Sequence, residues 1–379
     1  MQTRRALLAS GASGVAGLAG CLSVPSGDGG QRDGGDEINE GDNADIDARL
    51  GFVGDLMLGR SINERWTSEG ANPKDVWGST RSRLRELDGV IGNLECCVSD
   101  RGTRWPDKVY YFRADPEFAV SALEAAGAEF VSLANNHVLD YGERALRDTT
   151  QHLADAGIAH AGAGTDRDAA LEPAVFEAGG LTVAAFGLTD QAPKFGAGAS
   201  TPGTAFAPLD PFAPATRSLV TEILDRAAKH APDLVVASLH WGPNWETEPR
   251  GVHERFGRWL VEQGVDVVHG HSAHVLQGVE VYQGAPIIYD AGDFVDDYIS
   301  YRDREDVFNK RSALFEVVVR DGELEALVVE PTEIVDEAAT LADDGVAEWV
   351  HETLVERSAP FGTEINRRRG ETVIPLGDA

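Results

Sequence analysis

The fold is decided by residues 130–142, which read Phe-Val-Ser-Leu-Ala-Asn-Asn-His-Val-Leu-Asp-Tyr-Gly. The first five residues are apolar or small, which predicts a short buried strand. This strand runs directly into Asn135-Asn136-His137, and the following segment, 143–156, has helical spacing. A buried strand that ends in polar side chains and leads into a helix is typical of α/β proteins, in which ligands bind beyond the carboxyl ends of parallel strands.

The same arrangement recurs on both sides of this stretch. Further strands are predicted at 49–54, 88–93, 234–239 and 265–269, and helices at 75–87, 116–126, 215–230 and 253–263. A hairpin is predicted within 312–330, and a last helix at 346–357. Alternating strands and helices predict an α/β domain with a mainly parallel central sheet.

Polar side chains follow five of these strands at the point where each strand ends. The ligands predicted at this carboxyl edge are Asp55, Glu95, Asn136, His240, His271 and His274. Oxygen and imidazole donors without thiolates suit Mn, Zn, Fe or Mg better than a structural zinc site. Six such donors, with water, could hold one or two divalent ions.

Three more residues are predicted to serve catalysis at this edge. His137 follows Asn136 directly and could donate a proton to a leaving group. Asp140 could orient the His137 ring, and the planar guanidinium of Arg60 could bind an anionic oxygen. Asp290 and Asp293 lie near another predicted strand end, and structural and functional roles are both open for them. His269 lies inside an apolar strand and is expected to be structural.

Composition excludes several classes of protein. Of 379 residues, 42% are hydrophobic, which excludes wholesale disorder, and the net charge of -30 argues against a general nucleic-acid binder. An acidic chain with only five lysines is typical of a halophilic protein, because salt screens its self-repulsion. Cys96 and Cys97 are neighbours and are expected to be buried free thiols.

The first 48 residues predict export and anchoring. Arg4-Arg5 precedes an apolar stretch from Ala6 to Gly20, as in a twin-arginine signal. We expect Cys21 to be lipidated, although a cleaved signal with a chance cysteine is the alternative. Residues 22–48 are acidic and Gly-rich and predict a disordered tether. The expected parts are thus a signal with lipobox at 1–21, the tether at 22–48, a domain at 49–335, and a C-terminal helix and tail at 336–379.

Five motifs, in this order along the chain, resemble the capsule-synthesis CapA family, which includes the PgsA-type component of poly-γ-glutamate synthesis. They are Gly54-Asp-Leu-Met-Leu-Gly-Arg60, Asn93-Leu-Glu95, the run from Ala134 to Gly142, His240-Trp-Gly242 and Gly270-His-Ser-Ala-His-Val-Leu-Gln277. The resemblance covers roughly residues 50–297. It implies a four-layered α/β sandwich similar to calcineurin-like metallophosphoesterases, with a metal site at the carboxyl edge of the strands.

The sequence also departs from this pattern. Met57 stands where the phosphoesterases have a histidine, and Glu95 stands where they have an aspartate. Asn244 replaces a frequent glutamate, and Asp290 and Asp293 replace a serine and an asparagine. These departures leave a one-metal site open beside a two-metal site.

The N-terminal residues and the resemblance together predict an exported, membrane-tethered CapA-like protein on the outer face of the cell membrane. Such a protein assists the synthesis, transport or anchoring of an anionic polymer such as poly-γ-glutamate, through metal-dependent hydrolysis. Its expected partners are this polymer or the membrane synthase, and the membrane itself through Cys21, with no nucleic acid. An extracellular metallophosphatase or nucleotidase and a non-catalytic scaffold subunit of the synthase are the alternatives.

Overall fold

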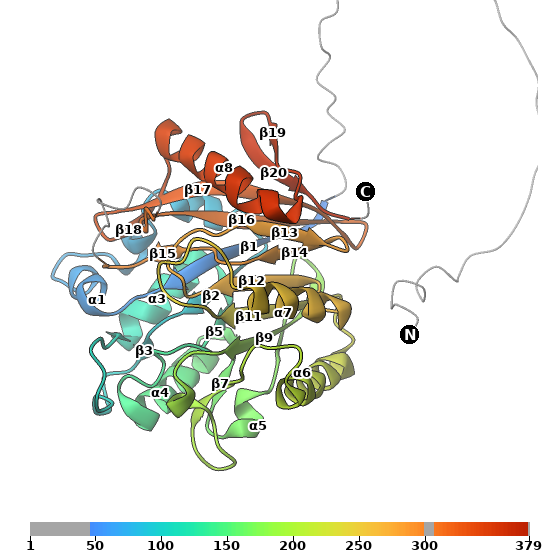
Figure 1. Ribbon diagram of the computed structural model, residues 1–379. Helices are drawn as coiled ribbons and strands as arrows, with labels where there is room; N and C mark the ends of the chain where they lie inside the picture. Colours follow the sequence, from blue (N-terminus) through green and yellow to red (C-terminus); the bar gives the residue numbers. More distant parts are fainter. Residues whose placement is uncertain (1–45, 299–306, 378–379) are drawn as a thin grey trace, which may run out of the picture. The chain divides into compact units, whose positions relative to one another are not determined.

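Two β-sheets lie face to face between layers of helices in the computed structural model (Figure 1). The structure describes residues 46–298 and 307–377. The predicted signal, Cys21 and nearly all of the tether therefore lie outside the described residues. Within the described part, no helix is both long enough and apolar enough to span a membrane.

The larger sheet has ten strands among the described residues, and its longest hydrogen-bonded path runs β19-β20-β17-β16-β1-β2-β5-β6. Parallel pairs join β1 to β2, β2 to β5 and β5 to β6. β15 pairs with β1 in parallel, and β18 pairs with β17. The strands are β1 (Ile46–Leu56), β2 (Gly89–Leu94), β5 (Ala128–Ser132), β6 (Ala159–Ala161), β15 (Asp293–Val295), β16 (Arg311–Arg320), β17 (Glu323–Val335), β18 (Ala338–Leu341), β19 (Asn366–Arg368) and β20 (Glu371–Pro375).

The smaller sheet has six strands in the order β13-β14-β12-β11-β9-β8. β9, β11, β12 and β14 are parallel. The strands are β8 (Ala174–Ala178), β9 (Leu181–Thr189), β11 (Leu234–His240), β12 (Val267–His271), β13 (Val279–Tyr282) and β14 (Ala285–Ile288). Two short pairs lie outside both sheets: β3 (Cys97–Val98) with β4 (Arg113–Ala114), and β7 (Ala163–Gly164) with β10 (Gly203–Thr204).

Side chains alternate between two cores along each central strand, as strand geometry requires. In β11, Leu234 and Val236 pack between the sheets, whereas Val235 and Ala237 face the outer helices. In β1, Leu50 and Phe52 face the inter-sheet core. A sheet buried on both faces explains why these strands read as continuous apolar runs.

Helices cover the outer face of each sheet. The larger sheet packs against α1 (Arg60–Trp66), α2 (Thr80–Leu84), α3 (Pro116–Ala126) and α4 (Gly142–Asp155), and the smaller sheet against α6 (Pro214–Ala227) and α7 (Gly251–Glu262). The order helix, sheet, sheet, helix is the four-layered α/β sandwich that the sequence predicts, so this fold class is confirmed. The remaining short elements are α5 (Arg167–Ala170), η3 (Pro73–Trp77), η4 (Pro193–Phe195), η5 (Ala228–His230) and η6 (Ala359–Phe361).

Helix boundaries follow local chemistry. The Asp115 side chain accepts hydrogen bonds from the backbone N–H groups of Glu117 and Phe118 at the start of α3, and Gly127 ends this helix with φ 72°. The helix predicted over 75–87 is instead η3 followed by α2. Gly78 separates them with φ 42°, and a side chain there would lie 2.5 Å from the Ala339 carbonyl oxygen.

The segment 336–379, set apart in the sequence analysis, contributes to the larger sheet. β20 pairs with β17, and α8 (Asp344–Ser358) lies beside β17 at the top of Figure 1. Val346, Val350 and Leu354 of α8 are buried in the inter-sheet core. The helix predicted at 346–357 is present, and the chain after it forms a hairpin of β19 and β20.

Candidate metal centre

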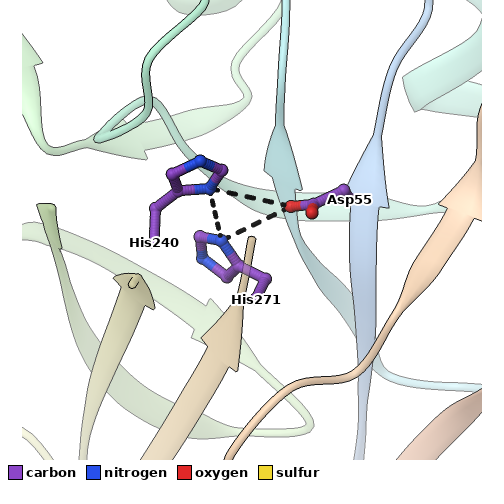
Figure 2. A group of neighbouring side chains, drawn as sticks. All are labelled: Asp55, His240 and His271. Carbon is purple, nitrogen blue, oxygen red and sulfur yellow. Dashed lines mark hydrogen bonds and ion pairs between the residues drawn. The ribbon is translucent and has the colours of Figure 1, made fainter. Parts of the chain in front are cut away.

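Asp55, His240 and His271 meet where the two sheets face each other, each at or next to the carboxyl end of its strand (Figure 2). Nδ1 of His240 lies 3.0 Å from Nδ1 of His271. Oδ1 of Asp55 lies 3.4 Å from the His271 nitrogen and 3.9 Å from the His240 nitrogen. One carboxylate oxygen and two imidazole nitrogens therefore point at one place.

A second group shares Asp55. It contains Asp55, Glu95, His274 and Asp293, all buried. Nδ1 of His274 lies 2.8 Å from Oδ1 of Asp293, 3.3 Å from Oδ2 of Asp55 and 4.0 Å from Oε2 of Glu95. Asp55 therefore offers one oxygen to each group.

A bulge in β1 aims Asp55 between the sheets. Phe52 pairs with Ile91 and Asp55 pairs with Asn93, so two residues of β1 face one residue of β2. Strict alternation after Phe52 would turn Asp55 toward the outer helices, and the extra residue turns it back. Asn93 holds the result, because its Nδ2 donates to Oδ1 of Asp55 at 2.7 Å.

The buried donors fit a divalent cation. Neither carboxylate oxygen of Glu95 has a hydrogen-bond partner among the described residues, nor do Oδ2 of Asp293 and Oδ1 of Asn136. Buried polar atoms are normally hydrogen-bonded, and buried charges are normally paired or bind metals. These unpartnered oxygens beside His240 and His274 are the donors that a metal ion would satisfy.

The carboxylates of this cluster have opposite pKa shifts. Burial raises the pKa of Glu95 well above its usual value, and the nearby Asp55 carboxylate adds to the effect. Burial also opposes ionisation of Asp55, but the hydrogen bond with His274 and the rings of His271 and His240 lower the pKa of Asp55 overall. Of Asp55 and Glu95, Asp55 is therefore the one that ionises more readily without a metal.

The pKa values of the histidines are also shifted in opposite directions. Burial lowers the pKa of His240 to about 4 and that of His271 well below its usual value, so both rings are neutral, as metal ligands must be. Burial alone would lower the pKa of His274 too, but the Asp293 and Glu95 carboxylates raise it well above its usual value. His274 thus supplies positive charge among the carboxylates.

His137 is held by its neighbours at the edge of the cluster. Nδ1 of His137 lies 2.6 Å from Oδ2 of Asp140, and Nε2 lies 3.8 Å from Oε1 of Glu95. The ring stacks on Phe112 with centroids 3.7 Å apart. Lys108 forms an ion pair with Asp140 and donates to the backbone carbonyl of Asn136. Burial lowers the pKa of His137 to about 4.

The remaining predicted residues take different places. Asn136 is half-buried next to His137, with its unpartnered Oδ1 available as a donor. The Arg60 guanidinium pairs with Asp297 and lies 4.7 Å from the centre of the Phe112 ring. The same Phe112 ring stacks on His137, so Arg60 lies one aromatic ring away from His137, and the described residues show no direct contact between Arg60 and the metal-binding groups.

Sequence reasoning does not identify Lys108 or Asn93 as contributors, and it leaves the role of Asp293 open. The place of Asp293 in the cluster depends on the pairing of β15 with β1, where Asp293 faces Asp55. Lys108 lies in the irregular stretch between β3 and β4, which carries no periodicity. Asn93 stands in one of the motifs, but nothing in the motif indicates that its side chain holds Asp55. The apolar runs that lead into Asp55 and Glu95 carry no signal for the positions of Asp293, Lys108 or Asn93.

The structure shows where two of the residues that depart from the family pattern lie. Met57 is fully buried in the core between the larger sheet and its helices, so it offers no donor to the cluster. Asn244 is exposed in the loop after β11. Cys96 and Cys97 are buried free thiols, as expected, and burial raises the pKa of Cys96 to about 12.

Comparison with known proteins agrees with this architecture. Residues 49–298 match the family described as bacterial capsule synthesis protein PGA_cap. The chain is 32% identical over 249 residues to the PGA biosynthesis protein CapA of Bacillus subtilis (strain 168), covering 65% of this chain and 62% of that protein. It is also 31% identical over 286 residues to the capsule biosynthesis protein CapA of Bacillus anthracis, covering 75% and 66%.

A probable polyglutamine synthesis accessory protein of Mycobacterium tuberculosis (strain CDC 1551 / Oshkosh) is 32% identical over 309 residues, covering 77% of this chain and 78% of that protein. The chain thus spans just under two thirds of each CapA relative and more of the mycobacterial one. The family match extends over most of the described domain and includes the ends of the strands that carry the cluster. The chain therefore belongs to the bacterial capsule synthesis PGA_cap family.

Proposed function

We propose that this chain assists the synthesis, transport or anchoring of an anionic surface polymer of the poly-γ-glutamate type, through metal-dependent hydrolysis at the cluster around Asp55. The observation that carries the proposal is the set of unpartnered buried oxygens on Glu95 and Asp293 beside four imidazoles. The printed names of the CapA and polyglutamine synthesis relatives support the polymer.

The residues that would hold metal are Asp55, Glu95, Asn136, His240, His271, His274 and Asp293. A bound divalent ion supplies Lewis-acid chemistry for attack by water on a carbonyl or phosphoryl centre. His137 would then act at the leaving group, where its Nε2 can hold or deliver a proton. Asp140 fixes the ring through Nδ1, and Phe112 limits its tilt by stacking.

The pair of Lys108 with Asp140 supports this role for His137. Asp140 also accepts a hydrogen bond of 2.7 Å from the backbone N–H of Phe112, so each of its oxygens is occupied. A carboxylate that is held on both oxygens keeps the imidazole in one orientation. Loss of Asp140 should therefore disturb catalysis without removing a metal ligand.

Metal content of the full chain tests the first half of the proposal. The protein is purified in high salt beside the double variant His271→Ala/His274→Ala and a control, His152→Ala/His230→Ala, which changes two histidines outside the cluster. We expect about one or two equivalents of Mn, Zn or Fe in the unaltered chain and the control, and loss in the first variant. Absence of metal after loading with excess ion would leave the scaffold function as the better account.

Hydrolysis tests the second half. Metal-loaded chain is incubated with poly-γ-glutamate and, separately, with a nucleotide and a phosphomonoester. Release of shorter γ-glutamyl chains that is lost in His137→Ala, with metal content unchanged, is the expected result. Turnover of the phosphoesters alone would favour the extracellular phosphatase instead.

We also propose that the chain is exported by the twin-arginine route and anchored through Cys21. The support is the Arg4-Arg5 pair, the apolar stretch that follows and the position of Cys21 at its end. Mass spectrometry of the membrane-bound protein should find a lipid on Cys21 as the new N-terminus. Cys21→Ser should release the protein from the membrane, and Arg4→Lys/Arg5→Lys should keep it inside.

A further inference from the structure

We infer that a basic rim beside His137 binds carboxylates of the polymer chain, one at each of three cations. The basic rim is Arg104, Arg113 and Lys194. This inference rests on the proposed function, since it takes from that function an acidic polymer as the molecule that reaches the cluster. It adds a separate binding site, outside the metal-binding groups, that selects a chain with one carboxylate in each residue.

The segment 101–113, which leads into β4, reverses the charge of the chain locally. It contains four basic residues and one acidic residue, whereas the whole chain contains 33 basic and 63 acidic residues. A surface with a net charge of -30 repels a polyanion, so close approach requires a place where the field changes sign. Because this segment is basic, it can attract an acidic chain to one side of the cluster.

Hydrogen bonds hold this segment against the residues that follow His137. The backbone N–H of Thr103 donates to the carbonyl of Tyr141 at 3.1 Å, and the N–H of Phe112 donates to the Asp140 carboxylate at 2.7 Å. The Phe112 ring also stacks on His137. The segment is therefore fixed on the His137 side of the cluster, and its cations are placed before a ligand binds.

The two arginines of the basic rim lie over aromatic rings. The Arg113 guanidinium is 4.0 Å from the centre of the Tyr141 ring, and the Arg104 guanidinium is 4.9 Å from the centre of the Tyr111 ring. Arg104 is exposed and Arg113 is half-buried, and neither forms an ion pair within the part of the chain that the structure describes. A guanidinium held over a ring keeps N–H groups that can bind a carboxylate as a fork.

Lys194 supplies the third cation from a distant part of the sequence. It lies in η4, and its Nζ is 5.6 Å from the centre of the Phe195 ring. Nζ of Lys108 is 5.2 Å from the centre of the same ring and 3.4 Å from Nδ1 of His137. Lys108 is paired with Asp140, whereas Lys194 is exposed and has no ion-pair partner among the described residues. Lys194 is therefore the lysine near His137 that a ligand can reach.

The distribution of these cations favours a row of single carboxylates over one phosphate group. Arg104 and Arg113 both lie near Tyr141, whereas Lys194 lies at Phe195, so the charges are spread over separate rings. A phosphate binds best where several donors converge on it. An acidic polymer of the glutamate type has one carboxylate in each residue, so successive residues can each meet one cation.

Exposed apolar side chains lie between the two arginines in the sequence. Val109 is 82% exposed and Tyr110 is 60% exposed. A polymer of the glutamate type has methylene groups between its carboxylates, and these groups can cover Val109 and Tyr110 when the carboxylates bind. The segment thus offers contacts to the apolar part of such a chain as well as to its charge.

Binding to the metal-stripped full chain tests the inference without any turnover. A fluorescently labelled γ-linked glutamate oligomer is titrated with the protein, and its anisotropy gives the Kd at several salt concentrations. The variant Arg104→Gln/Lys194→Gln removes two charges from exposed side chains. We expect it to raise the Kd by about tenfold, since each exposed charge pair contributes a few-fold. The Kd of this variant should also depend less on salt than that of the unaltered chain.

The matched control is Arg217→Gln/Lys229→Gln, which should leave the Kd unchanged. The Arg217 guanidinium is 5.3 Å from the centre of the Trp259 ring on the outer side of the smaller sheet, and Lys229 is exposed in η5. A second comparison reverses one charge, because Lys194→Glu should raise the Kd more than Lys194→Gln does. Circular dichroism checks that each variant is folded.

An unchanged Kd in Arg104→Gln/Lys194→Gln would overturn the inference, as would an equal rise in the control. Equal binding of the same oligomer with its carboxylates amidated, or tighter binding of a glycerol phosphate polymer, would also overturn it. In these cases the metal-content and hydrolysis experiments still decide the proposed function. Binding through the basic rim in a chain that holds no metal would uphold the inference, while the hydrolytic part of the proposed function fails.

Discussion

Gly54 is the position at which a single methyl group should damage both the fold and the cluster. A Cβ atom at Gly54 would lie 1.7 Å from the carbonyl oxygen of Gly292, whereas Cβ atoms essentially never approach another atom closer than 3.0 Å. The Gly54→Ala change must therefore push β15 away from β1 by about 1.3 Å. That movement strains the backbone hydrogen bonds from Asp55 to Gly292 and from Met57 to Val295, which are 3.0 and 2.9 Å long.

The expected cost follows from these contacts. Two weakened backbone hydrogen bonds contribute about 1 kcal/mol each, and overpacking of a tight contact adds about 1–3 kcal/mol. We therefore expect the free energy of unfolding to fall by about 3–5 kcal/mol. Because Asp293 begins β15, the same movement should also weaken metal binding at the group of Asp55, Glu95, His274 and Asp293.

Chemical denaturation of the full chain, followed by circular dichroism in the presence of a chelator, measures the first effect. Gly345→Ala is the control, since it adds the same methyl group near the start of α8, where the nearest atom lies at 3.4 Å. The control should be neutral or more stable by up to about 1 kcal/mol. A loss below about 1 kcal/mol in Gly54→Ala would refute the close approach of β15 to β1.

Three other outcomes are expected. Burial lowers the pKa of His269 to about 4, and its unfolded value is near 6.5. The unfolded chain therefore binds the extra proton, and stability falls as pH drops from 6.5 to 4. His269→Leu should reduce that fall by about 3 kcal/mol in denaturation curves taken across this range. Glu316 is buried and forms ion pairs with Arg49 and Arg83. In the same denaturation assay, Glu316→Gln should lower the free energy of unfolding by about 2–3 kcal/mol. The loss should be smaller than for a fully buried ion pair, because Arg49 is 36% exposed. Finally, Mn²⁺ at about a hundred times its Kd should raise the unfolding free energy of the metal-stripped chain by about 2.7 kcal/mol in the same assay, and no change would mean that the ion does not bind the native state.

The sheets and most of the cluster could be predicted because their signals are local. β1, β2, β5, β11 and β12 are buried on both faces, so each reads as a short apolar run with a polar residue at or just beyond its end. His240 and His271 could be placed on one edge because each ends a parallel strand. For these residues, the period of the strand and the position of its end contain enough information.

The positions of Asp55 and Asp293 needed information that no local pattern carries. Alternation along β1 gives the wrong face for Asp55, because the bulge between Phe52 and Asp55 is set by the pairing with β2. Asp293 lies beside Asp55 through a pairing between strands more than 200 residues apart. Lys108 reaches Asp140 from an irregular stretch. The β19–β20 hairpin is not predicted either, since β19 is only three residues long, two of them arginines, and carries no apolar period.

These pairings mean that the cluster and the sandwich form together. Asp55 reaches His240 and His271 only when the two sheets pack, and it reaches Asp293 only when β15 pairs with β1. Bringing Asp55, Glu95 and Asp293 into a buried place opposes folding, because the carboxylates lose water and either repel one another or must take up a proton, as the raised pKa of Glu95 indicates. The apolar core between the sheets, with Leu50, Phe52 and their partners, must supply the free energy that holds them there. A metal that binds the native state alone returns part of that free energy, so the affinity of the cluster and the stability of the sandwich should change together in any variant that alters the packing of β1.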